Sequence, residues 1–292
     1  MNLAAELAPL RQRIVARLEK VLPDSDVPPA NLHAAMRHGA LVPGKCVRGC
    51  LVYASGRALE VEIKHLDRLA CAMELIHAYS LVHDDLPCMD DDDIRRGRPS
   101  CHVAFGEATA MLAGNALLLY AIAEVASNEG FSETQRGAGV ERVCRAAGSL
   151  GMVGGQQMDM ELENVTECQT DLLDKVYRLK TGCLFHAAVM LPTELAQVGQ
   201  EQRDALDTYG RKIGLAFQIR DDLEDVEQDA LPAGSGTRPT YPALLGVEES
   251  RKRLSGLGTE ALEALDVFGN QADLLRSLAR WLAASSGNGS MA

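Results

Sequence analysis

The stretch LACAMELIHAYSLVHDDLPCMDDDD (69–93) joins a strongly apolar segment to a cluster of aspartates. Residues 69–82 would be apolar on nearly every side of a helix, which is typical of a helix buried in a protein core. Acidic runs by themselves are usually solvated loops. A buried helix that ends in carboxylates instead favours a bound cation.

The spacing of this first aspartate cluster requires a break in the helix. On a continuous helix Asp84 and Asp90 would point about 240° apart, so their carboxylates could not share one ion. Pro87 lies between them, and a proline ends or distorts a helix and lets the chain fold back toward Asp84. Several carboxylates without Cys or His ligands favour Mg²⁺ over Zn²⁺.

A second aspartate cluster lies in the helical run GRKIGLAFQIRDDLEDV (210–226). Asp221 and Asp225 are four residues apart, so their carboxylates share one helical face. Like charges at this spacing destabilise a helix unless a cation neutralises them, although solvated acidic faces are also common. Two Mg²⁺ sites that face each other across a cavity would imply a substrate with several phosphate oxygens.

Basic side chains that could bind such phosphates occur near both clusters. Arg95 and Arg96 follow the first cluster, Lys180 lies in KTG (180–182), and GKCVR (44–48) holds a further lysine and arginine. Arg forks and Lys point charges are the side chains that proteins use for phosphate. Each cation taken singly is more often an ordinary surface residue.

The rest of the chain reads as helical. Aromatic residues make up only 4%, and β-branched runs typical of strands are missing from the pattern. We expect an all-α protein with one domain over 1–286 and a flexible tail over 287–292. The three-and-four spacing of apolar residues predicts about ten helices, at 2–22, 47–56, 60–86, 107–128, 133–150, 152–163, 170–191, 199–228, 247–267 and 270–285.

Composition excludes some classes of function. The net charge of −12 argues against binding to nucleic acid. The eight cysteines are scattered and form no Cys-x-x-Cys pair, which indicates reduced thiols in a cytosol. The first twenty residues have no signal-peptide core, and no uninterrupted apolar run reaches spanning length. We therefore expect a soluble cytoplasmic protein without stable membrane insertion, and its large apolar helices favour a homodimer.

Together these segments resemble the trans-isoprenyl diphosphate synthase family, and most closely its bacterial farnesyl diphosphate synthases. The similarity runs from about residue 30 to about residue 285. The segments that carry it are GKCVR (44–48), ELIHAYSLVHDDLPCMDDDDIRRGRPSCHVAFGEATAMLAGNAL (74–117), GMVGGQQMD (151–159), KTG (180–182), GRKIGLAFQIRDDLED (210–225) and TYPALLG (240–246).

The resemblance implies a bundle of mostly antiparallel helices around a central cavity, and a magnesium-dependent prenyltransferase of isoprenoid biosynthesis. Such an enzyme condenses isopentenyl diphosphate with dimethylallyl or geranyl diphosphate and releases farnesyl diphosphate and diphosphate. The implied ligands of about three Mg²⁺ ions are Asp84, Asp85 and Asp90 in one motif and Asp221, Asp222 and Asp225 in the other.

The resemblance also implies roles for the remaining polar residues. Arg95 and Lys180 would clamp the allylic diphosphate, and Thr181 and Gln218 would face the developing allylic cation. The binding set for isopentenyl diphosphate would be Lys45, Arg48, His77 and Arg96. The released diphosphate would take the final proton, so no general base is assigned, and His83 is expected to pack beside the aspartates.

Two residues are candidates for limiting product length. Tyr79 and Ser80 lie one to one-and-a-half turns before Asp84, about 6–7.5 Å along the helix axis. A tyrosine there could close the cavity at a C15 tail. The alternative is that Tyr79 is an ordinary core aromatic.

The chain departs from the family pattern near the substrate. Cys46 and Gly49 occupy places usually held by Arg and Pro, Pro43 replaces a Gly, and Asn115 replaces an Asp. The loop at 229–240 is short and holds no lysine, so Arg238 would stand in for one. Alternatives that stay open are a C10 or C20 synthase, a weakened partner subunit or diphosphate-binding module, and a class I terpene cyclase.

Overall fold

The computed structural model describes residues 3–41, 44–162, 168–229 and 239–284. Helices dominate these residues, so the predicted all-α class is confirmed. Two compact units divide the chain, an N-terminal unit of residues 2–53 and 62–140 and a C-terminal unit of residues 54–61 and 141–292 with residue 1. The single domain expected over 1–286 stays a prediction, and the tail at 287–292 lies outside the described residues.

The N-terminal unit is a group of helices with one small hairpin. Helices α3 (Val47–Ala58) and α7 (Glu133–Ala147) each belong partly to this unit and partly to the other. Its own elements are α1 (Leu3–Val21), α2 (Ala30–Ala40), α4 (Ile63–Asp84), β1 (Ile94–Arg95), β2 (Arg98–Pro99), α5 (Cys101–Phe105) and α6 (Glu107–Ala126).

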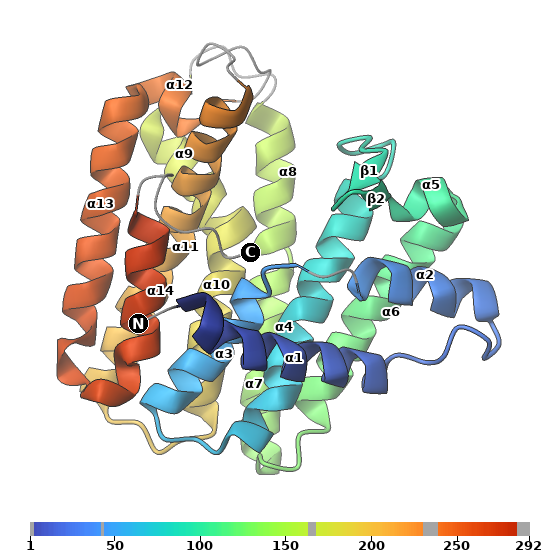
Figure 1. Cartoon of the computed structure of the whole chain (residues 1–292), viewed down its shortest axis with the longest axis horizontal. Coiled ribbons are helices and arrows are strands. Elements are labelled where there is room, and N and C mark those ends of the chain that lie inside the picture. Colours follow the sequence, from blue (N-terminus) through green and yellow to red (C-terminus); the bar gives the residue numbers. More distant parts are fainter. Residues whose placement is uncertain (1–2, 42–43, 163–167, 230–238, 285–292) are drawn as a thin grey trace. The chain divides into compact units, whose positions relative to one another are not determined.

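Helix α4 is the centre of the N-terminal unit. Every residue from Leu69 to Ile76 is buried, as its apolar sequence predicts. Helices α1, α2 and α6 pack against it, and Figure 1 shows α1 crossing it. Ion pairs hold α1 in place, because Arg17 donates to both carboxylate oxygens of Glu124 on α6 at 2.7 and 2.8 Å, and Arg68 on α4 donates to Glu124 at 2.9 Å.

Helix α6 has one buried and one exposed apolar face. By length and composition alone it could cross a membrane, but 39% of its apolar window is buried inside the protein. Ala113 and Leu117 are fully buried, and α6 packs on α4. Glu124 is buried and binds two arginines, so this side of α6 belongs to the core of the unit. The side that carries Leu112 and Leu119 is exposed.

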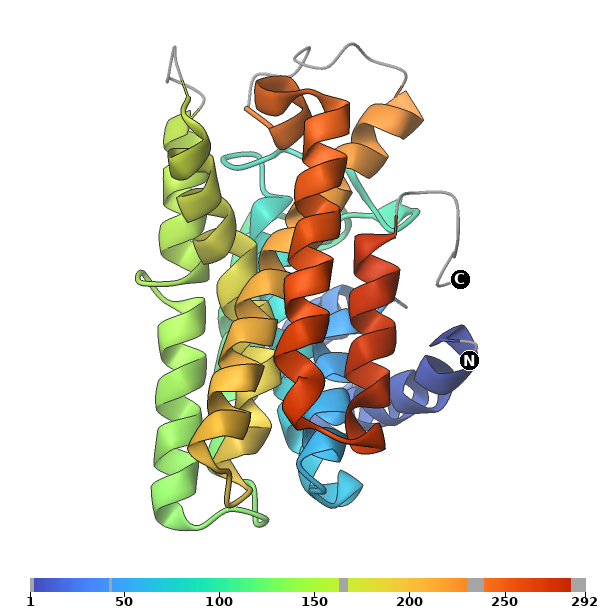
Figure 2. The same cartoon turned by 90° about the vertical axis from the view of Figure 1, so that its left-hand side faces the viewer.

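The C-terminal unit is built around α11. This helix packs against α10, α13 and α14, and Figure 2 shows α13 and α14 side by side. Its elements are α8 (Met152–Leu162), α9 (Thr170–Tyr177), the π-helical turn η1 (Arg178–Gly182), α10 (Cys183–Met190), the 3-10 turn η2 (Leu191–Glu194), α11 (Gln200–Asp229), α12 (Tyr241–Leu245), α13 (Val247–Ala264), the 3-10 turns η3 (Leu265–Val267) and η4 (Asn270–Ala272), and α14 (Asp273–Ala283).

Most predicted helices are present with ends displaced by a few residues. The helix predicted over 170–191 is confirmed as one helical run from Thr170 to Met190, in which the π-helical turn η1 lies between α9 and α10. The short helices α2, α5 and α12 and the β1–β2 hairpin were not predicted. Helices α5 and α12, with five residues each, and the two-residue strands offer too few apolar positions for a periodic pattern, whereas α2 has the length of α8 but fewer large apolar residues.

Candidate active site

The first aspartate motif begins where α4 ends. Helix α4 stops at Asp84, three residues before Pro87, and the chain folds back so that the Asp90 backbone N–H donates to the Asp84 carbonyl at 2.9 Å. The predicted break in the helix is therefore confirmed. It brings the backbones of Asp84 and Asp90 together, although they are six positions apart.

The second aspartate of this motif is held by the protein itself. Asp85 is only 2% exposed, and Arg95 donates to its Oδ1 through Nε at 2.8 Å and through a terminal nitrogen at 2.5 Å. The same guanidinium binds Asp92 at 2.6 Å. Burial raises the pKa of Asp85, and Arg95 opposes that shift. Asp90 is exposed and Asp84 is half-buried, so these two aspartates are the more accessible.

A tight hairpin positions the two adjacent arginines. Strands β1 and β2 pair antiparallel with Arg95 opposite Arg98. Arg96 and Gly97 form the two-residue turn and have φ angles of 53° and 73°, as the favoured hairpin turns require. The turn separates the two guanidinium groups. Arg95 binds Asp85, whereas Arg96 lies against Gly44. The contact with Gly44 is so close that a Cβ atom added to this glycine would lie 2.7 Å from Arg96 Cζ.

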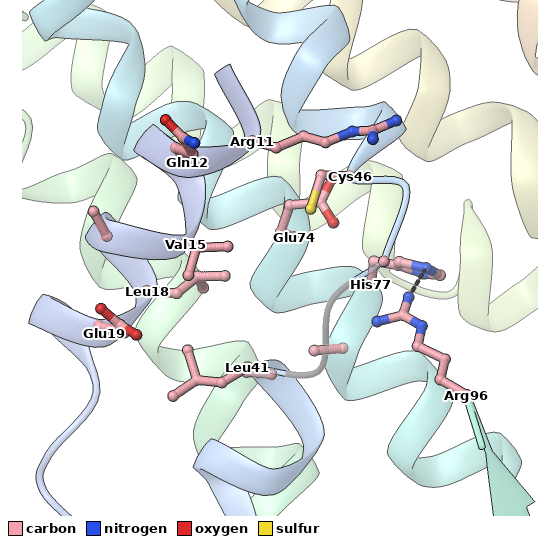
Figure 3. A pocket seen from close by; sticks show the side chains of 14 residues that line it. Arg11, Gln12, Val15, Leu18, Glu19, Leu41, Cys46, Glu74, His77 and Arg96 are labelled. Carbon is pink, nitrogen blue, oxygen red and sulfur yellow. Dashed lines mark hydrogen bonds between the residues drawn. The ribbon is translucent and has the colours of Figure 1, made fainter. Parts of the chain in front are cut away.

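Arg96 meets His77 beside a pocket of about 410 Å³ (Figure 3). An Arg96 terminal nitrogen lies 3.4 Å from His77 Nε2, and because Arg has no acceptor, this His77 nitrogen accepts the hydrogen bond. Burial lowers the pKa of His77 well below its ordinary value, and the nearby arginines lower it further. His77 is therefore neutral at pH 7, and Arg96 supplies the positive charge of this pair.

The GKCVR segment leads into α3. Lys45 is exposed, and its carbonyl accepts a hydrogen bond from Arg11 Nε of α1 at 3.1 Å. Cys46 has a φ of 46°, and burial raises the pKa of its thiol to about 12, so it does not act as a thiolate. Arg48, the other predicted phosphate ligand, is half-buried on the first turn of α3.

The unusual Gly49 has a structural explanation. Its backbone N–H donates to the buried carboxylate of Glu74 at 2.8 Å. A Cβ atom at Gly49 would lie only 2.6 Å from Ile14 Cδ1. A proline would have no N–H and too little space, so the departure from the family pattern fits the packing of α1 and α4 in this chain.

The candidate chain-length residues lie on α4 before the first motif. Tyr79 is buried, and its ring meets the His83 ring edge-on with centroids 5.2 Å apart. The Ser80 hydroxyl donates to the His77 carbonyl at 2.9 Å. His83 Nε2 lies 3.1 Å from the Met111 carbonyl on α6, which fits the expected packing role.

The second aspartate motif lies near the C-terminal end of α11. Asp221 and Asp225 are exposed on one face. Asp222 is buried, and its Oδ2 accepts from the Tyr177 hydroxyl at 2.8 Å and from the Tyr241 backbone N–H at 3.0 Å. Burial raises the pKa of Asp222 to about 7. Asp222 therefore ties α11 to α9 and α12.

The candidate catalytic residues meet at the π-helical turn η1. The Thr181 hydroxyl donates to Gln218 Oε1 at 2.7 Å, so the structure brings these two predicted residues together. Lys180 Nζ donates to Asp159 Oδ2 at 2.6 Å. Helix α8 packs closely on this turn at Gly155, which has no side chain. A Cβ atom at this position would lie only 2.1 Å from the Lys180 backbone nitrogen. Arg238 lies outside the described residues.

Asp159 is a site residue that sequence reasoning missed. It is buried on α8 and pairs with Lys180, the cation assigned to the allylic diphosphate. The segment GMVGGQQMD (151–159) was recognised as a family anchor, but its aspartate was given no role. The acid that ends this anchor, on a helix that precedes the lysine of KTG, was the available signal.

Both motifs pair an accessible aspartate with a buried one. Asp84 and Asp221 are the accessible members, whereas Asp85 and Asp222 are bound by protein donors. Among the residues that the structure describes, no three His, Cys, Asp or Glu side chains form a closed metal site. Open oxygen donors fit Mg²⁺, which keeps several waters and binds through one or two carboxylates plus substrate phosphate.

Comparison with known proteins decides the family. The polyprenyl synthetase family model matches residues 29–253. The chain belongs to this family. It is 44% identical to farnesyl diphosphate synthase of Escherichia coli over 246 residues, which cover 81% of this chain and 82% of that protein.

Two further relatives cover more of the chain. Farnesyl diphosphate synthase of Haemophilus influenzae is 38% identical over 274 residues, 91% of this chain and 92% of that protein. The crystal structure of an FPP/GFPP synthase from Zymomonas mobilis, determined without ligand, matches with a TM-score of 0.90 at 36% identity and covers 97% of this chain and 99% of its own. Family membership therefore extends over nearly the whole length.

Proposed function

We propose that this chain is a magnesium-dependent farnesyl diphosphate synthase, which joins isopentenyl diphosphate to dimethylallyl or geranyl diphosphate and releases diphosphate. The observation that carries the proposal is the presence of both aspartate motifs, each with an accessible aspartate beside a buried, hydrogen-bonded one. The relatives named farnesyl diphosphate synthase, at 38% and 44% identity, support a C15 product.

The proposed metal ligands are the carboxylates of both motifs. Asp84, Asp90, Asp221 and Asp225 are the more accessible members. Asp85 would contribute through Oδ2, and Asp222 through Oδ1, which accepts a long 3.4 Å hydrogen bond from Gln218 Nε2. About three bound Mg²⁺ ions would neutralise charge on the departing diphosphate. These residues would therefore bind and orient the allylic diphosphate.

The remaining residues would bind the two diphosphates and stabilise the allylic cation. Lys180 and Arg95 carry positive charge beside the two motifs and would hold the allylic diphosphate. Thr181 and Gln218 would present oxygens to the developing allylic cation. The set proposed for isopentenyl diphosphate is Lys45, Arg48, His77 and Arg96, with Arg238 as a further cation.

Product sizing tests the proposal. The purified protein is incubated with Mg²⁺, isopentenyl diphosphate and each allylic primer in turn, and the dephosphorylated products are separated by chromatography. We expect farnesol from geranyl diphosphate. Geraniol or geranylgeraniol as the main product would indicate the alternative chain lengths. No product from folded protein would support a weakened partner subunit, and a cyclic hydrocarbon from one substrate would support a terpene cyclase.

We further propose that two copies pair through α6 in the cytoplasm. Met111, Leu112 and Leu119 are 48%, 57% and 66% exposed on this helix. No charged residue occurs between Glu107 and Glu124, and Asn115 is uncharged where the family usually has Asp. Two chains of net charge −12 repel each other, and an apolar face without charged residues is where a second copy would meet the least repulsion.

Light scattering after gel filtration tests this pairing. We expect a dimer for the natural chain and a monomer for Leu119→Glu. The matched control is Leu150→Glu, which alters a leucine that is 73% exposed on another part of the chain and should stay dimeric. A monomeric natural chain would contradict the proposal.

A further inference from the structure

The turn of α11 that carries the second aspartate motif contains an arginine whose side chain is largely covered by the protein. The Arg220 side chain is 12% exposed, although it directly precedes Asp221. Its Nε donates to Glu224 Oε1 at 2.6 Å, one helical turn later. An arginine beside three aspartates would ordinarily compete with Mg²⁺ for their carboxylates. The contacts of Arg220 instead draw its charge to another face of the helix.

Helix α14 supplies the other contacts of Arg220. A terminal nitrogen of Arg220 donates to the Trp281 carbonyl, which lies in the last turn of α14. The guanidinium carbon lies 4.2 Å from the centroid of the Trp281 ring. The last carbonyls of a helix have no intrahelical donor, and an aromatic face attracts a cation, so both interactions favour the arginine at this place.

The motif is consequently held from two sides. Arg220 ties it to α14, and Asp222 ties it to α9 and α12 through Tyr177 and Tyr241. Residues that point toward these helices are buried, whereas Asp221 and Asp225 are exposed. The rotation of this turn about the axis of α11 is thereby set by protein contacts before any metal binds.

We propose that Arg220 and Trp281 are positioning residues for the second aspartate motif, so that α14 controls its affinity for Mg²⁺ and diphosphate. This inference rests on the proposed function, because it assumes that Asp221 and Asp225 bind the metal. Neither Arg220 nor Trp281 is proposed to contact the substrate. They orient the carboxylates and keep the arginine charge away from them.

Calorimetric titration of the full chain with Mg²⁺ at a fixed concentration of inorganic pyrophosphate tests the inference. We expect Arg220→Gln and Trp281→Ala each to raise the Mg²⁺ concentration at half-saturation by about tenfold, the usual effect of losing a partner that orients a metal ligand. The double variant should show no more than the larger single effect, because both residues act through one contact.

The controls separate positioning from general stability. Arg211→Gln removes a matched arginine on the same helix, which pairs with Asp207 four residues away, and should leave half-saturation unchanged. At saturating Mg²⁺ and substrates, kcat of Arg220→Gln should stay within about twofold of the natural value, as expected for a change in metal binding. If Trp281→Ala does not fold, Trp281→Phe and Arg220→Lys decide by the same criterion.

Fluorescence gives a second readout, since Trp281 is the only tryptophan of the chain. We expect Mg²⁺ with pyrophosphate to shift its emission in the natural protein and not in Asp221→Asn. Unchanged half-saturation in folded Arg220→Gln and Trp281→Ala, or additive effects of the pair, would overturn the inference. Absence of prenyl product would instead refute the proposed function, whereas the titration would still decide the role of Arg220.

Discussion

The Tyr177 hydroxyl donates a 2.8 Å hydrogen bond to Asp222 Oδ2, and this bond joins α9 to the second aspartate motif. Asp222 is 6% exposed, so loss of one donor leaves a buried carboxylate less well solvated. The Tyr241 backbone N–H, at 3.0 Å, would remain the other donor to the same oxygen.

Tyr177→Phe should therefore lower the free energy of unfolding by about 1–3 kcal/mol. Urea denaturation monitored by circular dichroism measures the change. The control is Tyr120→Phe, whose hydroxyl has no hydrogen bond to any residue in the described parts of the chain, and it should change stability little. Equal stability of Tyr177→Phe and the natural protein would show that the hydrogen bond from Tyr177 to Asp222 does not stabilise the fold.

Tyr79→Ala should lengthen the product beyond C15. The tyrosine is 7% exposed and lies five residues before Asp84 on α4, so its removal opens space beside the proposed tail of the substrate. Chromatography of the dephosphorylated products measures chain length. Tyr79→Phe keeps the ring and should still give C15. An unchanged C15 product from Tyr79→Ala would mean that Tyr79 is an ordinary core aromatic.

His186 should make stability depend on pH. Burial lowers its pKa below the ordinary value of 6.5, although its 2.8 Å bond to Asp207 opposes that shift. The unfolded chain then takes up a proton at a higher pH than the folded chain. Stability from this group is complete above about pH 6.5 and declines as pH falls toward the folded pKa, by at most about 1.4 kcal/mol per pH unit.

His186→Gln cannot titrate, so it should flatten the pH dependence of stability below about pH 6.5. Urea midpoints measured across this range test the change. Val267→Ala, an exposed substitution without a titratable group, should keep the natural slope. The same slope in His186→Gln would show that the dependence arises elsewhere.

Glu124→Ala should destabilise the protein strongly. Two arginines, Arg17 and Arg68, point at this 3% exposed glutamate and would lose their partner. Breaking a buried ion pair costs about 3 kcal/mol or more. Glu141→Ala breaks an exposed pair with Arg145 and should change stability by about 0.5 kcal/mol or less. Thermal unfolding of both variants compares them, and equal midpoints would contradict this view of α1.

The helical class and the break after Asp84 could be predicted because each follows from local chemistry. An all-round apolar run specifies a buried helix, and a proline before further aspartates specifies its end. The 2.9 Å bond from the Asp90 N–H to the Asp84 carbonyl is the direct result. The family resemblance implied that Thr181 and Gln218 face the same allylic cation, and the hydrogen bond between them became known from the structure.

Other features depend on contacts between distant segments. Asp84 and Asp85 look equivalent in the sequence, and only Arg95 makes one of them a buried partner. The π-helical turn at Arg178–Gly182 reflects close packing against α8, which a periodic pattern does not record. The Arg220 contact with Trp281 joins residues 61 positions apart.

In the proposed function, both aspartate motifs bind one allylic diphosphate through magnesium. The most direct test is calorimetric titration with geranyl thiodiphosphate, an unreactive analogue of the allylic substrate, with and without Mg²⁺. We predict one molecule bound per chain only when Mg²⁺ is present, with affinity at least about tenfold weaker in Asp84→Asn and in Asp221→Asn and unchanged in the exposed control Asp266→Asn. Binding without Mg²⁺, or unaltered affinity in either motif variant, would contradict binding of the diphosphate by both motifs through magnesium.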